Sequence, residues 1–160
     1  MSFEESSKAV RQKLAKLTDT DPNDWYLCLK ARFGAAQVFN ALRDIKGYGE
    51  VITTPYTCIT AINPILTAGL KPVYADIDKE FLSTSSVKNT LIHPRTRAIV
   101  MQHTLGMIGD KTKLAKLAED RNLLLVEDSA HCVTRFARTK SGRILADISI
   151  HSFGVEKVTT

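Results

Sequence analysis

The sequence lacks the features that mark several specialised classes of protein. It has no apolar run of the roughly 18 to 20 residues that a membrane-spanning helix needs, so no membrane contact is expected. Its three cysteines, Cys28, Cys58 and Cys132, form no C-x-x-C pair, which argues against a disulfide framework or a thiolate metal site. The opening MSFEESSKAV has no basic-then-apolar order, so no secretory signal is predicted and a cytoplasmic protein is expected.

Clustered charge is also absent. The 22 lysines and arginines are scattered along the chain, and without a basic stripe or a known module no nucleic-acid surface is predicted. The four histidines show no i, i+3 or i, i+4 pairing, so no zinc site is expected. What remains is a chain of 160 residues, 44% hydrophobic and 24% charged, which is typical of one globular domain. Its net charge of +5 is compatible with an enzyme of anionic substrates.

Short apolar segments alternate with helical patterns over most of the chain. Runs of strand length, most of them apolar on both faces, occur at Trp25–Ala31, Val51–Thr54, Pro72–Ile77, Ala98–His103, Leu123–Glu127 and Ile148–Phe153. Helical spacing occurs at Ser6–Leu17, Ala35–Ile45, Cys58–Ala68 and Lys111–Arg121. This order predicts a three-layer α/β/α domain over residues 25–160 with a mostly parallel sheet, preceded by a helix and linker over 1–24.

Three sets of residues follow predicted strands and therefore share one edge of the sheet. Gly34, Ala35 and Ala36 open a helix, where backbone amides can hold a phosphate or small residues can simply form a tight turn. Asp128 follows an apolar strand, and its side chain is either a functional carboxylate or the N-cap of a helix. Lys157 follows the last predicted strand, and it is either a nucleophile or an ordinary surface lysine.

Taken together, these three features match the needs of one cofactor. Pyridoxal phosphate requires an anion site for its phosphate, a carboxylate facing its pyridine nitrogen and a lysine for its aldehyde. The residues therefore predict pyridoxal 5'-phosphate as cofactor, with Asp128 and Lys157 as the catalytic residues.

The motifs E-D-x-A-H at Glu127–His131 and S-F-x-x-x-K at Ser152–Lys157 resemble those of the DegT/DnrJ/EryC1/StrS sugar aminotransferases. The resemblance covers about residues 25–160 and matches the first half or less of a typical member, so the small C-terminal domain is expected to be absent. It implies that Lys157 forms the Schiff base and that Asp128 faces the pyridine nitrogen. It further implies cofactor contacts by Gly34, Ala35, Ala36, Cys58, His131 and Ser152.

Two positions depart from the family pattern. Cys58 stands where an aromatic side chain usually stacks on the cofactor ring, and Ala35 replaces a threonine or serine that donates a hydroxyl to the phosphate. The resemblance implies a homodimer that transfers an amino group, usually from glutamate, to a nucleotide-linked keto-sugar. The alternative is an inactive truncated fragment or pseudoenzyme that acts as an interaction or dimerisation module.

Overall fold

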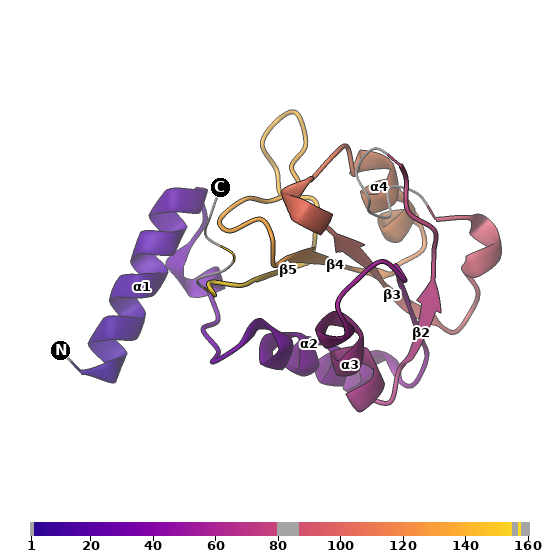
Figure 1. The fold of residues 1–160 in the computed structure, drawn as a ribbon, viewed down its shortest axis with the longest axis horizontal. Helices are drawn as coiled ribbons and strands as arrows, with labels where there is room; N and C mark the ends of the chain where they lie inside the picture. Colours follow the sequence, from indigo (N-terminus) through magenta and orange to yellow (C-terminus); the bar gives the residue numbers. More distant parts are fainter. Residues whose placement is uncertain (1, 80–86, 155–156, 158–160) are drawn as a thin grey trace.

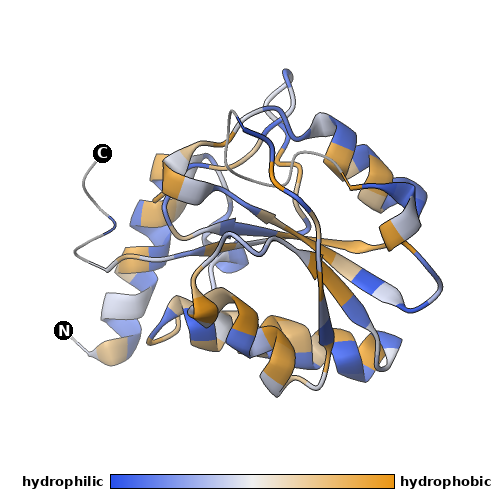
Figure 2. Ribbon diagram, turned by 45° about the vertical axis from the view of Figure 1, so that its right-hand side comes forward, coloured by the Kyte–Doolittle hydropathy of each residue, from blue (hydrophilic) through white to orange (hydrophobic). Residues whose placement is uncertain are grey.

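The computed structural model describes residues 2–79, 87–154 and 157, and it contains a parallel sheet with helices on both faces (Figures 1 and 2). The helices are α1 Phe3–Thr18, α2 Ala31–Lys46, α3 Ile59–Thr67 and α4 Thr112–Asp120, with short 3₁₀ turns at Pro22–Asp24, Asn89–Leu91 and Thr104–Gly106. The strands are β1 Glu50–Thr53, β2 Lys71–Tyr74, β3 Thr96–Gln102, β4 Leu124–Ser129 and β5 Ile148–His151.

The five strands lie in the order β2-β1-β3-β4-β5, and every neighbouring pair is parallel. This arrangement confirms the predicted α/β class. Because all strands run the same way, their carboxyl ends lie along one edge of the sheet. In particular, the register pairs Gln102 with Asp128 and Asp128 with Ile150, which places the ends of β3, β4 and β5 side by side.

Each face of the sheet is covered by its own apolar core, because successive side chains of a strand point to opposite faces. Val51 and Val126 face α2 and α3, where Phe39 and Ile65 complete one core. The neighbouring strand residues pack on the other face with α4, a cluster that includes Ile52, Ile99, Met101, Leu114 and Leu125. The continuous apolar runs of the sequence thus reflect burial on both sides.

The predicted strand at Trp25–Ala31 is wrong, because this segment is an irregular connection that leads into α2. Tyr26 and Leu29 are 77% and 85% exposed, and Trp25 donates its indole N–H to Thr20 Oγ1 at 2.8 Å. The run is apolar, but within the described residues no strand pairs with it. Apolar composition alone therefore did not identify a strand here.

The predicted helix at Ser6–Leu17 is confirmed and begins three residues earlier, at Phe3. A capping box explains the earlier start: the Glu5 amide donates to the Ser2 hydroxyl, and the Ser2 amide donates to the Glu5 carboxylate. The other end is fixed by Arg138, which donates to the Thr18 carbonyl at 2.6 Å. Within the described residues, none of the helices has both the length and the apolar character required to span a bilayer.

Candidate active site

An open cleft of about 1110 Å³ lies at the carboxyl ends of β3, β4 and β5. Its walls come from the segment that precedes α2, the start of α3 and the residues that follow the three strands. Of the residues predicted to form the site, the cleft is lined by Gly34, Ala35, Cys58, Asp128, His131, Ser152 and Lys157. The structure thus brings together all the predicted site residues except Ala36, which does not line the cleft.

Asp128 lies near the carboxyl end of β4 with its side chain in the cleft wall. One carboxylate oxygen accepts the backbone N–H of Ala130 at 3.0 Å. Burial raises the pKa of the Asp128 carboxyl above its ordinary value, while nearby positive charge on His131 and Lys157 acts in the opposite direction. An ionised Asp128 is therefore costly unless a cation binds to it, which is the property expected of a carboxylate that pairs with a positively charged ligand.

Lys157 and Ser152 enter the cleft from the segment that follows β5. The backbone N–H of Lys157 donates to the Gly154 carbonyl at 2.8 Å. The lysine is half-buried, and its charge acts on both Asp128 and Cys58. Since β4 and β5 are neighbours, the acid and the amine reach the cleft from adjacent strands.

Cys58 is the N-cap residue of α3 and is exposed within the cleft. The Thr60 hydroxyl donates to its sulfur at 3.1 Å, and this bond is the main reason why the pKa of the Cys58 thiol is lowered. Lys157 and Arg32 lower the same pKa by their positive charge. Cys58 thus lines the same cleft as Asp128 and Lys157, and its contact with the cofactor ring stays a prediction.

His131 has one ring nitrogen fixed by the protein. Its Nδ1 accepts the backbone N–H of Leu105 at 3.1 Å, so a neutral His131 carries its proton on Nε2. Leu105 reaches this position in a left-handed conformation, with φ of 53°. The tight turn after β3 thus orients His131 as a hydrogen-bond donor in the cleft wall.

The start of α2 differs from the prediction. The helix begins at Ala31, so Gly34 lies inside its first turn and the Gly34 amide donates to the Lys30 carbonyl at 3.3 Å. The Gly34 amide is consequently not free for a ligand. The amides without intrahelical partners belong to Ala31 and Arg32, three and two residues before Gly34, and this end of α2 also lines the cleft.

Sequence reasoning missed two polar residues at the end of β3 that contribute to the cleft. Gln102 donates to the Tyr56 carbonyl at 3.2 Å and accepts the Thr57 hydroxyl, which fixes the segment that carries Cys58. His103, completely buried, follows directly. The available signal was the change from apolar to polar residues at the end of the strand, the same signal that identified Asp128.

His151, the last residue of β5, lies in an aromatic environment. Its ring lies 5.5 Å from that of Trp25 and 4.6 Å from that of Phe136. Desolvation lowers the pKa of His151, so the neutral ring is favoured. These contacts attach the irregular segment before α2 to β5 at the rim of the cleft.

The comparison with known families agrees with this geometry. Residues 34–160 match the model of the DegT/DnrJ/EryC1/StrS aminotransferase family. The chain belongs to this family. Its members are pyridoxal-phosphate-dependent aminotransferases, so the predicted family, reaction class and cofactor class agree with the match.

Individual relatives give the same result. The chain is 35% identical to the spore coat polysaccharide biosynthesis protein SpsC of Bacillus subtilis, over 76% of this chain and 32% of that protein. It is 33% identical to the dTDP-4-amino-4,6-dideoxy-D-glucose transaminase of Shigella dysenteriae, over 78% of this chain and 34% of that protein. The chain spans about a third of the length of the curated relatives it matches.

Solved structures confirm the fold. The aminotransferase TlmJ from Streptoalloteichus hindustanus superposes with a TM-score of 0.79 at 28% identity, covering 92% of this chain and 40% of that one. DesI, solved in the presence of its TDP-sugar product, gives a TM-score of 0.71 at 25% identity, covering 93% of this chain and 37% of that one.

Proposed function

We propose that this chain forms the cofactor-binding part of a pyridoxal-phosphate-dependent aminotransferase that moves an amino group from an amino acid, glutamate in the first instance, to a nucleotide-linked keto-sugar. The observation that carries the proposal is the meeting of Asp128 and Lys157 in one cleft, from adjacent parallel strands. The names of the relatives, which include dTDP-sugar and GDP-sugar enzymes, support the substrate class.

The residues of the cleft fit the two ends of pyridoxal phosphate. At one end, Asp128 is a carboxylate whose pKa is raised by burial, and a protonated pyridine nitrogen supplies the cation that it lacks. At the other end, Ser152 and the start of α2 line the cleft with a hydroxyl group, free amides and the Arg32 side chain. These groups suit a phosphate.

When bound, pyridoxal phosphate supplies an electron sink for the bond changes at the substrate carbon. Asp128 holds the proton on the ring nitrogen that makes this sink effective. His131, whose Nδ1 accepts the Leu105 N–H, would use Nε2–H to donate a hydrogen bond to the 3-hydroxyl oxygen of the cofactor ring. Lys157 would hold the cofactor through Nζ, and its free amine would serve as the general base and acid that moves a proton.

A homodimer is part of the proposal. Beside the cleft, Tyr26, Leu29 and Phe33 expose apolar side chains, at 77%, 85% and 49%, and a second copy of the chain would cover such a surface. The alternative of an inactive interaction module makes a different prediction about the cofactor, because it requires no covalent bond to a lysine.

One experiment decides between the two functions. The purified chain is mixed with pyridoxal phosphate, reduced with borohydride, digested and analysed by mass spectrometry. A pyridoxyl group on Lys157 is expected, accompanied by a visible absorption band before reduction that borohydride removes. A chain that acquires no band and no modified lysine would be an interaction module rather than an aminotransferase.

Replacing Cys58 by an aromatic residue is expected to tighten cofactor binding. Cys58 is exposed in the cleft, so Cys58→Phe or Cys58→Tyr adds a ring without displacing a core residue. The gain expected for an added aromatic pair is about 0.5 to 1.5 kcal/mol, measured as the equilibrium affinity for pyridoxal phosphate. Cys58→Ser, which adds no ring, is the control, and equal affinities for all variants would show that Cys58 is not at the ring-stacking position.

A further inference from the structure

A second carboxylate lies beside Asp128 in the chain and has no role in the site described so far. Glu127 is completely buried in β4 and does not line the cleft. It accepts hydrogen bonds from His103 Nε2 at 2.7 Å, from the Ala137 backbone N–H at 2.6 Å and from the Ser149 hydroxyl. One carboxylate thus joins three elements that surround the cleft: the end of β3, the segment that follows β4, and strand β5.

The contact with Glu127 fixes the orientation of the His103 ring. An ionised carboxylate can only accept, so His103 Nε2 must carry a hydrogen. The ring is completely buried, and its Nδ1 has no hydrogen-bond partner among the residues that the structure describes. His103 is also part of the cleft wall, and its backbone N–H donates to the Asp128 carbonyl at 3.1 Å.

Glu127 acts on the cleft through its hydrogen bond to His103. Side chains alternate along a strand, so Glu127 and Asp128 point to opposite sides of β4 and Glu127 does not touch a ligand beside Asp128. The His103 ring bonds Glu127, on the side of β4 away from Asp128, while the His103 backbone N–H bonds the Asp128 carbonyl. The position of His103 therefore bears directly on the position of Asp128 at the end of β4.

We propose that Glu127 is a positioning residue, which holds His103 and the neighbouring strand β5 against the end of β4 and thereby sets the placement of the Asp128 carboxylate that binds a cationic ring nitrogen. The inference rests on the proposed function, because it assigns Asp128 to the cofactor nitrogen. It adds two residues to the site, His103 at the cleft wall and Glu127 behind it.

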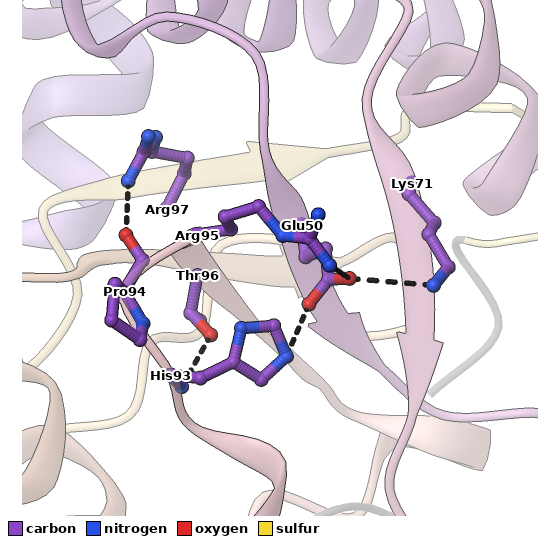
Figure 3. A network of polar contacts seen from close by, with 7 residues as sticks. All are labelled: Glu50, Lys71, His93, Pro94, Arg95, Thr96 and Arg97. Carbon is purple, nitrogen blue, oxygen red and sulfur yellow. Dashed lines mark hydrogen bonds and ion pairs between the residues drawn. The ribbon is translucent and has the colours of Figure 1, made fainter.

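The molecule contains its own control for this proposal. At the opposite, amino end of the sheet, the buried Glu50 carboxylate lies 2.6 Å from His93 Nε2, 3.3 Å from Lys71 Nζ and 3.8 Å from the Arg95 guanidinium (Figure 3). Glu50 begins β1, whereas the cleft lies at the carboxyl ends of the strands. Glu50 and Glu127 are thus buried carboxylates that each bind a histidine, and only one of them adjoins the cleft.

The test compares Glu127→Gln with Glu50→Gln. Glutamine keeps the shape and an acceptor oxygen but removes the charge. Glu127→Gln is expected to bind pyridoxal phosphate about tenfold more weakly, and to shift the visible band of the bound cofactor, whereas Glu50→Gln should leave both unchanged. If Glu127→Gln and Glu50→Gln have equal effects, the carboxylate acts on general stability and the inference is wrong.

A double-mutant cycle tests whether Glu127 acts through His103. His103→Asn should itself weaken cofactor binding, and adding Glu127→Gln to it should cause no further loss. Additive losses would contradict the inference. His103→Asn leaves Glu127 in place, so it provides a result even where Glu127→Gln does not fold.

Nitrogen NMR of the wild-type chain without cofactor gives an independent measurement. His103 is expected to carry a proton on Nε2, and a bare Nε2 would overturn the inference without reference to the cofactor. A wild-type chain that binds no pyridoxal phosphate would refute the proposed function itself. A wild-type chain that binds it, with Glu127→Gln binding equally well, would refute only the role of Glu127.

Discussion

Lys157→Ala is expected to abolish the covalent attachment of pyridoxal phosphate while leaving the cofactor able to bind. The amine of Lys157 is the group that attaches to the cofactor in the proposed site, and alanine has no nucleophile to replace it. Asp128 and the phosphate end of the cleft are untouched, so non-covalent binding should persist. Borohydride reduction followed by peptide mass spectrometry should show no modified lysine, and transfer of the amino group should fall to the background rate.

A second lysine in the same cleft provides the control for this prediction. Lys30 caps the start of α2 and also lines the cleft, but no catalytic role is assigned to it. Lys30→Ala should keep the pyridoxyl modification of Lys157 after reduction. A Lys157→Ala protein that carries the modification on Lys30, or on any other lysine, would place the covalent site elsewhere.

The sequence allowed the sheet to be predicted because its central strands, β1, β3 and β4, are buried on both faces. Runs such as Ala98–His103 have no polar side, and only a strand between two helical layers explains this pattern at such a length. The same criterion failed at Trp25–Ala31, where the run is apolar but exposed and lies along the cleft. Whether an apolar segment finds a neighbouring strand depends on the rest of the fold and cannot be read from its composition.

Strand topology made part of the site predictable, but it does not determine contacts between individual side chains. Asp128 and Lys157 converge because the carboxyl ends of adjacent parallel strands must meet. The contact between Glu127 and His103 depends on the orientation of two side chains that are 24 positions apart, and no spacing rule encodes it. The predicted start of α2 was wrong because small residues such as Gly34 occur both before a helix and within its first turn.

Asp128→Asn is expected to disable the proposed reaction with little change in the fold. The amide has the size of the carboxyl group and can still accept the Ala130 N–H, but it carries no charge to hold a proton on the ring nitrogen of the cofactor. Removal of one such electrostatic contact costs about 10²–10³-fold in rate. The measurement is the rate at which added glutamate converts the bound cofactor to its amine form, and an unchanged rate would remove Asp128 from its assigned role.

The same substitution should have the opposite effect on the stability of the chain without cofactor. Burial raises the pKa of Asp128 in the folded state above the value of about 4 in the unfolded chain. The folded state therefore binds this proton more tightly, and the Asp128 contribution to stability decreases as the pH rises from about 4 through the raised value. In Asp128→Asn the free energy of unfolding should not show this decrease with rising pH, because the amide does not ionise.

The expected pattern is specific enough to exclude a purely structural role for Asp128. Below pH of about 4, the wild-type carboxyl and the amide are both neutral, and the two proteins should have similar free energies of unfolding. At neutral pH the Asp128→Asn chain should be the more stable one in denaturant titrations without cofactor. Addition of pyridoxal phosphate should then stabilise the wild type more than the variant, because only the wild type offers a carboxylate to the cationic nitrogen. A variant that is less stable than the wild type at neutral pH without cofactor would show that Asp128 supports the fold rather than the ligand.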